Sequence, residues 1–154
     1  MPVEIILGQF RPGLPATRMM LARYDELGQV EPAREILEYY AQLGASTARQ
    51  APPAEAAELW FELHDVYRRL GSPREELHAL QTAVALMPNE YRVHYTLAAA
   101  LVRGRQFAEA EQHLRWCLER KGEDAQLRDQ LAAVVKSRID GQRVSISQEP
   151  ARWR

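Results

Sequence analysis

The sequence of 154 residues contains a single cysteine and almost no net charge, with 20 Lys and Arg against 21 Asp and Glu. One cysteine cannot form a disulfide within the chain or build a Cys-rich zinc site, which excludes small disulfide-framework scaffolds. A formal net charge of -1 supplies no overall positive field to attract a nucleic-acid backbone. We therefore expect no nucleic-acid partner.

Long hydrophobic runs are absent as well. The longest apolar run, from Leu97 to Val102, is far below the ~18 residues that suggest a membrane span. Near the start of the chain Glu4 interrupts the apolar residues, so no secretory signal is visible. We expect no membrane partner and a cytoplasmic location. With 46% hydrophobic and 27% charged residues, the composition is typical of one folded globular domain.

Motifs of the common catalytic sites are also missing. The sequence has no Gly-rich phosphate loop, Ser-centred nucleophile elbow or metalloprotease helix motif. His113 and Cys117 have the spacing at which two ligands on a helix share a metal ion, but two more ligands would be needed. We therefore interpret Cys117 as a small buried apolar side chain and His94 as a packed ring. The prediction is a protein with no catalytic residue, no metal and no cofactor.

What the sequence does contain is a helical period of apolar residues. It predicts seven helices, at residues 17–27, 32–43, 54–70, 73–87, 91–103, 107–120 and 124–138. Glycines lie between these segments, where a helix would end in a left-handed residue. They are Gly28, Gly44, Gly71, Gly104 and Gly122. No run of four or more residues in this region alternates as a strand would, so an internal sheet is not expected.

A set of residues in the middle of the chain has the spacing of a known helical repeat. The set consists of Trp60, Leu63, His64, Tyr67, Gly71, Leu80, Ala83 and Pro88. It resembles the 34-residue tetratricopeptide signature. Residues 91–124 resemble a second copy, in which Phe107, Ala110 and Leu114 match the later half of the signature and Arg105 stands in the glycine slot. A weaker copy lies at about residues 14–47.

The spacing of the repeats also predicts an insertion. From Gly28 to Gly71 is 71 − 28 = 43 residues, whereas from Gly71 to Arg105 is 105 − 71 = 34. Residues 48–56 account for the difference. We expect part of this insertion to lengthen the next helix at its N-terminus, with Pro53 in the first turn.

The resemblance implies an all-α fold, a right-handed superhelix of about three tetratricopeptide-like helix pairs plus a C-terminal capping helix. The expected domain spans residues 14–138, with repeats at about 14–47, 57–90 and 91–124 and the capping helix at 125–138. Residues 1–13 form an N-terminal flank and residues 139–154 a C-terminal tail. In the capping helix, the apolar residues Leu127, Leu131, Val134 and Val135 are expected to form one packed stripe.

The two flanks are less regular. Val3–Phe10 is apolar enough to be buried, and the prolines and glycine that follow it prevent a continuous helix. In the tail, Asp140 and Gly141 indicate a turn, and Val144–Ser147 alternates like a short strand. Either flank could pack on the repeats or on a second copy of the chain, and a disordered tail is the alternative.

Tetratricopeptide domains bind extended peptides or partner helices along the concave surface formed by the first helix of each repeat, and the resemblance carries this expectation to the present chain. The expected groove residues are Arg18, Phe61, Glu62, Asp65, Arg68, Arg92 and Tyr95. Of these, Phe61 and Tyr95 are the strongest candidates because an aromatic side chain in a groove can anchor a partner.

The charges in this set bear on the kind of partner. Arg18 and Arg92 match basic positions of the co-chaperone clamp, which holds the terminal carboxylate of a chaperone tail. Glu62 and Asp65 depart from that pattern, and like charges at short range repel. We therefore expect a basic or amphipathic protein or peptide as the partner.

Two other functions stay open from the sequence. The chain could be an oligomerising or regulatory segment of a larger multidomain protein, which would self-associate without binding a peptide. It could also be a small metal-binding or catalytic all-α protein, which would require bound metal or turnover. Our main prediction is a non-enzymatic protein-interaction module.

Overall fold

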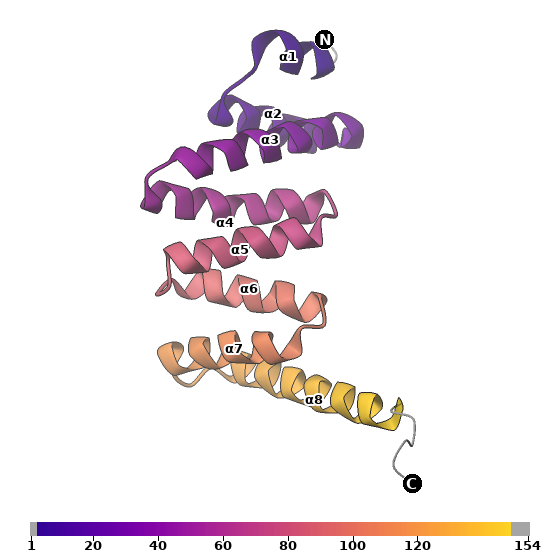
Figure 1. Cartoon of the computed structure of the whole chain (residues 1–154). Coiled ribbons are helices and arrows are strands. Elements are labelled where there is room, and N and C mark those ends of the chain that lie inside the picture. The colour runs from indigo at the N-terminus through magenta and orange to yellow at the C-terminus, as the bar shows by residue number, and fades with distance from the viewer. Residues whose placement is uncertain (1–2, 149–154) are drawn as a thin grey trace. The chain divides into compact units, whose positions relative to one another are not determined.

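The computed structural model describes residues 3–148 of the chain, with side chains from residue 6 to residue 142. All the regular structure in this part is helical (Figure 1). The helices are α1 (Val3–Phe10), α2 (Leu14–Glu26), α3 (Val30–Gln50), α4 (Pro53–Arg69), α5 (Pro73–Leu86), α6 (Tyr91–Arg103), α7 (Phe107–Lys121) and α8 (Ala125–Gln148). The all-α prediction is confirmed, and α1 is a helix that the sequence did not predict.

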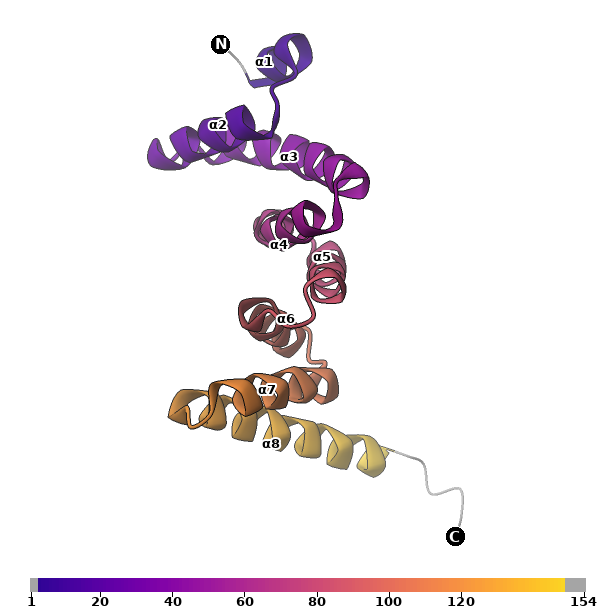
Figure 2. The ribbon, with the colours of Figure 1, turned by 90° about the vertical axis from the view of Figure 1, so that its left-hand side faces the viewer.

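The helices form two compact units, Met1–Asn89 and Glu90–Arg154. In the first unit α2 packs on α3, α3 on α4 and α4 on α5, while α1 lies on α3. In the second unit α6 packs on α7 and α7 on α8, and Figures 1 and 2 both show α7 and α8 running along each other. The pairs α2–α3, α4–α5 and α6–α7, followed by α8, match the predicted tetratricopeptide-like organisation.

The same turn closes the first helix of each pair. Its left-handed residue is Gly28 after α2 (φ 65°), Gly71 after α4 (φ 70°) and Arg105 after α6 (φ 59°). At each turn the next backbone N–H reaches back five residues, as Ser72 does to the carbonyl of Tyr67 at 2.9 Å, so terminal carbonyls are satisfied. The prediction that Gly104 is left-handed is wrong, because its φ is -79° and Arg105 takes that conformation.

The insertion lengthens the helices on both sides of it, α4 at its N-terminus as predicted and α3 at its C-terminus in addition. Helix α3 continues to Gln50, whereas α4 begins at Pro53, which stands in the first turn as expected. Gly44 is therefore buried inside α3 and does not end it. A Cβ at Gly44 would lie 2.7 Å from Cδ2 of Leu63 in α4, so the missing side chain is what lets the two helices approach.

The core of each unit consists of aliphatic side chains with alanines at the helix contacts. Ile36 and Leu63 are fully buried in the first unit, as are Leu101 and Ala110 in the second. Trp60, only 6% exposed, places its ring edge-on to His78 of α5, at a centroid distance of 5.7 Å. Burying this apolar stripe stabilises helices that would be marginal in isolation.

The N-terminal flank is partly attached to the repeats. The hydroxyl of Tyr39 donates a hydrogen bond of 2.8 Å to the carbonyl of Pro12, which fixes the link between α1 and α2. The sequence indicated that Val3–Phe10 is apolar enough to be buried, and Phe10 departs from this with an exposure of 66%. Ile6 and Leu7 are half-buried, whereas Phe10, the last residue of α1, is largely exposed.

The C-terminal predictions of a turn and a strand are wrong. Helix α8 runs through Asp140, Gly141 and Val144–Ser147 to Gln148. A strand needs a partner to satisfy its backbone groups, and the described chain offers none, whereas continuing the helix satisfies them locally. One internal glycine costs a helix only about 1 kcal/mol. Residues 149–154, including Trp153, lie outside the described residues.

The predicted single stripe of α8 is divided between two faces. Leu127 and Val134 are 2% and 5% exposed, whereas Leu131 and Val135 remain half-buried. At 100° per residue, Leu127 and Val134 point in one direction and Leu131 and Val135 in an adjacent one. Only the first direction faces the interior of the second unit.

Candidate partner-binding site

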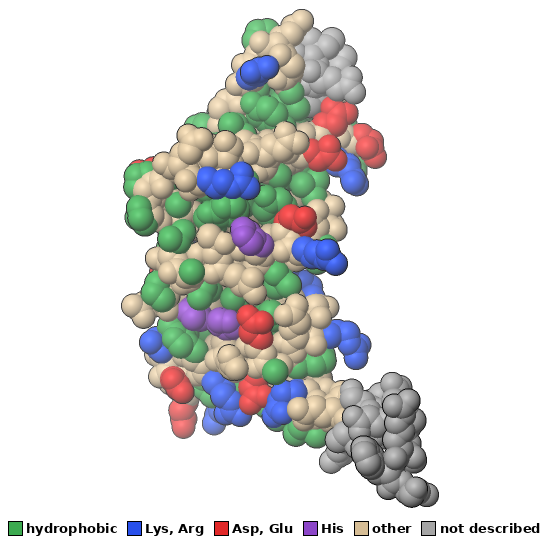
Figure 3. Space-filling view, viewed as in Figure 1, with side chains coloured by type: hydrophobic (Ala, Val, Ile, Leu, Met, Phe, Trp, Pro, Cys, Tyr) green, Lys and Arg blue, Asp and Glu red, His purple; other side chains and the backbone are tan. Residues whose placement is uncertain are grey.

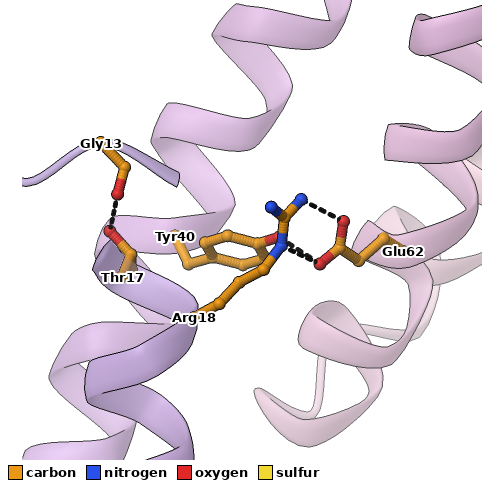
Figure 4. A network of polar contacts seen from close by, with 5 residues as sticks. All are labelled: Gly13, Thr17, Arg18, Tyr40 and Glu62. Carbon is orange, nitrogen blue, oxygen red and sulfur yellow. Dashed lines mark hydrogen bonds and ion pairs between the residues drawn. The ribbon is translucent and has the colours of Figure 1, made fainter. Parts of the chain in front are cut away.

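Two of the predicted groove residues pair with each other. Arg18 of α2 and Glu62 of α4 form a bidentate ion pair with N–O distances of 2.5 and 2.6 Å (Figure 4). The hydroxyl of Tyr40 of α3 donates to the same carboxylate at 2.5 Å and accepts from Nε of Arg18 at 3.0 Å. Three helices of the first unit are thus connected through one carboxylate.

The network has a defined charge state at neutral pH. Partial burial alone would raise the pKa of the Glu62 carboxyl, but hydrogen bonds from Arg18 and Tyr40 outweigh it and hold that pKa below its ordinary value. Burial and the bond to Glu62 raise the pKa of the Tyr40 hydroxyl well above its ordinary value. The carboxylate is therefore ionised and the hydroxyl neutral. Because Arg18 matches its charge, Glu62 offers a partner less negative charge than its sequence position suggests.

The remaining predicted residues of α4 also have contacts within the helix. Asp65 and Arg68 form an ion pair of 2.6 Å, and both side chains are about half exposed. Phe61 is half-buried, with its ring 4.9 Å from that of His64, and its carbonyl contacts Nδ1 of His64. Phe61 therefore contacts its own helix, and its role as an anchor stays a prediction.

A groove of about 470 Å³ lies between α2 and α4 in the first unit. Leu14 and Leu59 provide its apolar surface, and the long C-terminal part of α3 forms one end. Its charged lining consists of Arg18, Glu55, Glu58 and Glu62. Three of these four side chains are carboxylates and one is a cation, so acidic side chains outnumber basic ones in the lining.

Tyr95 lies at a pocket of the second unit. The pocket has a volume of about 280 Å³ and is mainly apolar, and its lining comes from α6, α7 and α8. The lining residues are Tyr95, Ala98, Ala99, Val102, Leu114, Gln130, Ala133 and Val134. The amide Nε2 of Gln130 donates a hydrogen bond of 3.0 Å to the Tyr95 hydroxyl and so holds the ring toward α8. Tyr91 stacks on the Tyr95 ring at 6.1 Å.

Arg92 is the seventh predicted residue. It stands in the first turn of α6, and its Nε lies 3.6 Å from Glu90. Both side chains are nearly half exposed, so the contact is a weak surface pair.

A ring cluster between α6 and α7 was only partly foreseen. His94 is 6% exposed, as predicted for a packed ring, and stacks on Trp116 at a centroid distance of 3.7 Å. Its Nδ1 lies 2.9 Å from Nδ1 of His113, and the guanidinium of Arg120 lies 3.7 Å from the Trp116 ring. Burial and the neighbouring His94 lower the pKa of His113, which favours its neutral form. We interpret the cluster as helix packing.

Cys117 is fully buried, as predicted, and burial raises the pKa of its thiol to about 11. In the part of the chain that the structure describes, no three His, Cys, Asp or Glu side chains are close enough to hold a metal ion.

None of the described helices is both long and apolar enough to cross a membrane. On the face shown in Figure 3, side chains of both charge signs are interspersed between apolar ones.

The predicted groove residues thus fall into three groups. Arg18 and Glu62 line the α2–α4 groove together, and Tyr95 lines the apolar pocket. Phe61, Asp65, Arg68 and Arg92 line neither. Sequence reasoning missed Gln130 and Ala133 because it limited the partner surface to the first helix of each of the three repeats. Helix α8 comes directly after the third pair, in the position that the first helix of a further repeat would take.

No protein-family model and no curated protein matches the sequence. Solved structures similar to the chain include the type III secretion chaperone SycD of Yersinia enterocolitica in complex with a peptide of the translocator YopD. It has 16% identity and a TM-score of 0.47, and 80% of this chain and 88% of that chain are covered. A thermophilic TPR protein of Thermus thermophilus has 20% identity and a TM-score of 0.45, with 86% and 87% covered. MamA of Desulfovibrio magneticus has 14% identity and a TM-score of 0.40, with 89% and 97% covered.

The fold of the chain is tetratricopeptide-like. Two independent observations lead to this description. One is the repeat spacing of the sequence, and the other is the set of three helix pairs with a left-handed residue at the same turn of each.

Proposed function

We propose that the chain is a non-enzymatic interaction module that binds a peptide or a partner helix. The observation that carries the proposal is the apolar pocket beside Tyr95, about 280 Å³ in volume. Ala98, Ala99 and Ala133 leave this space open because each ends at a methyl group. Transfer of a Leu or Phe side chain from water into such a pocket contributes roughly 1.5–3 kcal/mol. The pocket therefore suits one apolar anchor residue of the partner.

The mouth of the pocket has polar groups for a partner's backbone. The Tyr95 hydroxyl accepts a hydrogen bond from the side-chain amide of Gln130 and can still donate one of its own. The side-chain oxygen Oε1 of Gln130 can accept a further hydrogen bond. An extended peptide has unpaired N–H and C=O groups along its length that suit both. This supports a bound segment whose side chain enters the pocket while its backbone stays at the mouth.

The α2–α4 groove supports a partner with basic residues. Glu55 and Glu58 add negative charge beside the paired Glu62, and Leu14 and Leu59 add apolar surface. A Lys or Arg side chain combines an apolar stem with a cationic end and so matches both parts of this lining. The proposed partner is therefore amphipathic, with apolar and basic residues.

Selection from a random peptide display library on the whole chain tests the proposal. The affinity of a selected peptide is then measured by fluorescence anisotropy on the wild type and on Ala133→Phe, which fills the pocket from an exposed position of α8. We expect Ala133→Phe to lose at least about tenfold in affinity. Glu119→Ala, an exposed position of α7 outside the pocket, is the matched control and should bind as the wild type does.

Circular dichroism establishes that Ala133→Phe is still folded. A library that yields no binder contradicts the proposal, and so does a set of binders whose affinity is unchanged by Ala133→Phe. For the groove, Glu55→Lys should weaken selected peptides that contain Lys or Arg, and this difference should shrink in high salt. Equal affinity for wild type and Glu55→Lys would remove the groove from the binding site.

A further inference from the structure

A third pocket lies within the first unit, where the end of α3 and the start of α5 meet α4. Its volume is about 290 Å³, close to the lower end of the roughly 300–1,000 Å³ that is typical of small-molecule pockets. Its lining residues are Arg49, Trp60, Tyr67, Arg74, Glu75 and His78. None of them lines the α2–α4 groove or the pocket beside Tyr95, so the proposed function does not account for this pocket.

Trp60 supplies a hydrogen-bond donor that the fold leaves without an acceptor. The residue is almost fully buried, and its indole Nε1–H has no hydrogen-bond acceptor among the described residues. In that part of the chain no fully buried side-chain nitrogen or oxygen lacks a hydrogen bond, so Nε1 of Trp60 reaches open space. The pocket is where Trp60 borders such space, and the indole N–H is therefore available there.

The hydroxyl of Tyr67 is a second available donor. Tyr67 is half-buried, and its hydroxyl also has no hydrogen-bond partner among the described residues. Burial raises the pKa of this hydroxyl in spite of nearby Arg49, so the group is neutral at pH 7 and can donate. Trp60 and Tyr67 are 67 − 60 = 7 residues apart on α4, which places both side chains on one face of the helix.

Two guanidinium groups reach the pocket from the neighbouring helices. Arg49 belongs to the last turn of α3 and Arg74 to the first turn of α5, and both are exposed. Neither has a hydrogen bond or an ion-pair partner in the described part of the chain. The planar guanidinium fork matches the oxygens of an oxyanion, so two such groups at one pocket favour an anionic ligand.

The other two lining residues leave this preference in place. Glu75 stands in the first turn of α5, where a helix favours negative charge. Two guanidinium groups against one carboxylate leave 2 − 1 = 1 positive charge at the pocket. The ring of His78 packs edge-on to Trp60 and carries at least one N–H donor in either tautomer.

We propose that this pocket binds a phosphate group, either as the free ion or as the phosphate ester of a small molecule. Every lining side chain except Glu75 offers a donor, and these donors come from three helices. A tetrahedral phosphate presents acceptor oxygens in several directions, whereas a carboxylate presents two oxygens in one plane. Donors on three sides therefore suit a phosphate better than a carboxylate.

Trp60 provides the reporter for the test. The chain has 3 tryptophans, so an NMR spectrum of the full chain labelled with the nitrogen isotope contains few indole N–H signals, and Trp60→Phe identifies that of Trp60. Sodium phosphate is titrated at pH 7, with sodium chloride keeping the ionic strength constant. We expect a saturable shift of the Trp60 signal between about 0.1 and 20 mM phosphate, with the Trp116 signal unmoved. Sodium acetate should produce little shift over the same range.

Phenyl phosphate distinguishes the two sources of the group. Tighter binding of phenyl phosphate than of inorganic phosphate identifies an ester as the ligand, and an ester that binds no more tightly identifies the free ion.

Variants of the lining establish which side chains hold the phosphate. Arg49→Gln and Arg74→Gln should each raise the dissociation constant at least about fivefold, because each removes a charge-assisted contact. Tyr67→Phe removes one hydroxyl and should raise it about threefold. Arg128→Gln removes the same charge from an exposed position of α8 outside the pocket and should bind as the wild type does.

Three results would overturn the proposal. They are a Trp60 signal that phosphate does not move, a signal that acetate moves as strongly, and an affinity for phosphate that stays unchanged in both Arg49→Gln and Arg74→Gln. Circular dichroism establishes that each variant is folded.

Discussion

At the scale of single residues, the Arg18–Tyr40–Glu62 network connects two repeats through groups of very different exposure. Tyr40 is 2% exposed, whereas the side chains of Arg18 and Glu62 are 46% and 38% exposed. Exposed ion pairs contribute about 0–1 kcal/mol, because water screens the charges and ordering long side chains costs entropy. The network therefore orients α2 and α4 more than it stabilises them.

The lowered pKa of Glu62 gives the network a pH dependence. A carboxyl whose pKa is lower in the folded state contributes stability above its unfolded pKa, and this is lost as the pH falls through the folded pKa. Glu62→Gln should therefore lower the free energy of unfolding at pH 7 by up to about 1 kcal/mol, a value limited by solvent screening. Urea unfolding at pH 7 and pH 3 measures this. A difference that is as large at pH 3 as at pH 7 would contradict the assignment.

Arg105 occupies a backbone conformation that suits glycine better. Its φ of 59° matches Gly28 and Gly71 at the equivalent turns, and a left-handed non-glycine residue costs roughly 1–2 kcal/mol. Arg105→Gly should raise the free energy of unfolding by about 1 kcal/mol, less than the full strain because glycine is more flexible in the unfolded chain. Thermal unfolding checks this.

The equivalent position supplies the control for that prediction. Gly71→Ala introduces the same strain into the turn after α4 and should lower the melting temperature. If Arg105→Gly also lowers it, the turn after α6 is stabilised by the Arg side chain, and the argument from backbone conformation is wrong.

At the scale of helices, the close approach of α3 and α4 depends on Gly44. Its absent Cβ would stand 2.7 Å from Leu63, which is fully buried. Gly44→Ala should therefore destabilise the chain by about 1–3 kcal/mol through overpacking, even though alanine is the better helix former. Urea unfolding measures the change.

Gly141 is the matched position for Gly44. It also lies inside a helix, but a Cβ there meets nothing within 4 Å. Gly141→Ala should raise stability by up to about 1 kcal/mol through helix propensity alone. The same sign of change at both positions would show that helix propensity, and not the α3–α4 contact, determines the effect.

These two glycines illustrate what the sequence could reveal about the elements. Helical periodicity located seven helices and the repeat spacing located the insertion, because both signals lie within short stretches of chain. The sequence does not show whether Gly44 ends a helix or lies inside one. The residue that explains Gly44 is Leu63, which lies on another helix and contacts it only in the folded structure. Likewise, four alternating residues in the tail could not outweigh the continuation of α8, which keeps every backbone bond local.

The candidate site was predictable to a similar degree. Tyr95 could be found because the repeat spacing locates it on the first helix of its pair. The pairing of Arg18 with Glu62 spans 44 residues, and their types alone do not distinguish two groove charges from an internal ion pair. Gln130 was missed because its role comes from its contact with Tyr95, 35 residues away.

At the scale of the whole molecule, nearly equal numbers of acidic and basic residues leave no long-range field to attract a partner. In the proposed function, specificity comes from local features, namely the apolar pocket beside Tyr95 and the carboxylates of the α2–α4 groove.

The most direct test of the proposed binding site is an NMR titration of the isotope-labelled chain with the selected peptide. We predict that backbone amide shifts concentrate in α6 from Tyr95 to Val102 and in α8 from Gln130 to Val134, and that Ala133→Phe abolishes them. Shifts that avoid both segments, or that persist in Ala133→Phe, would contradict the proposed binding site.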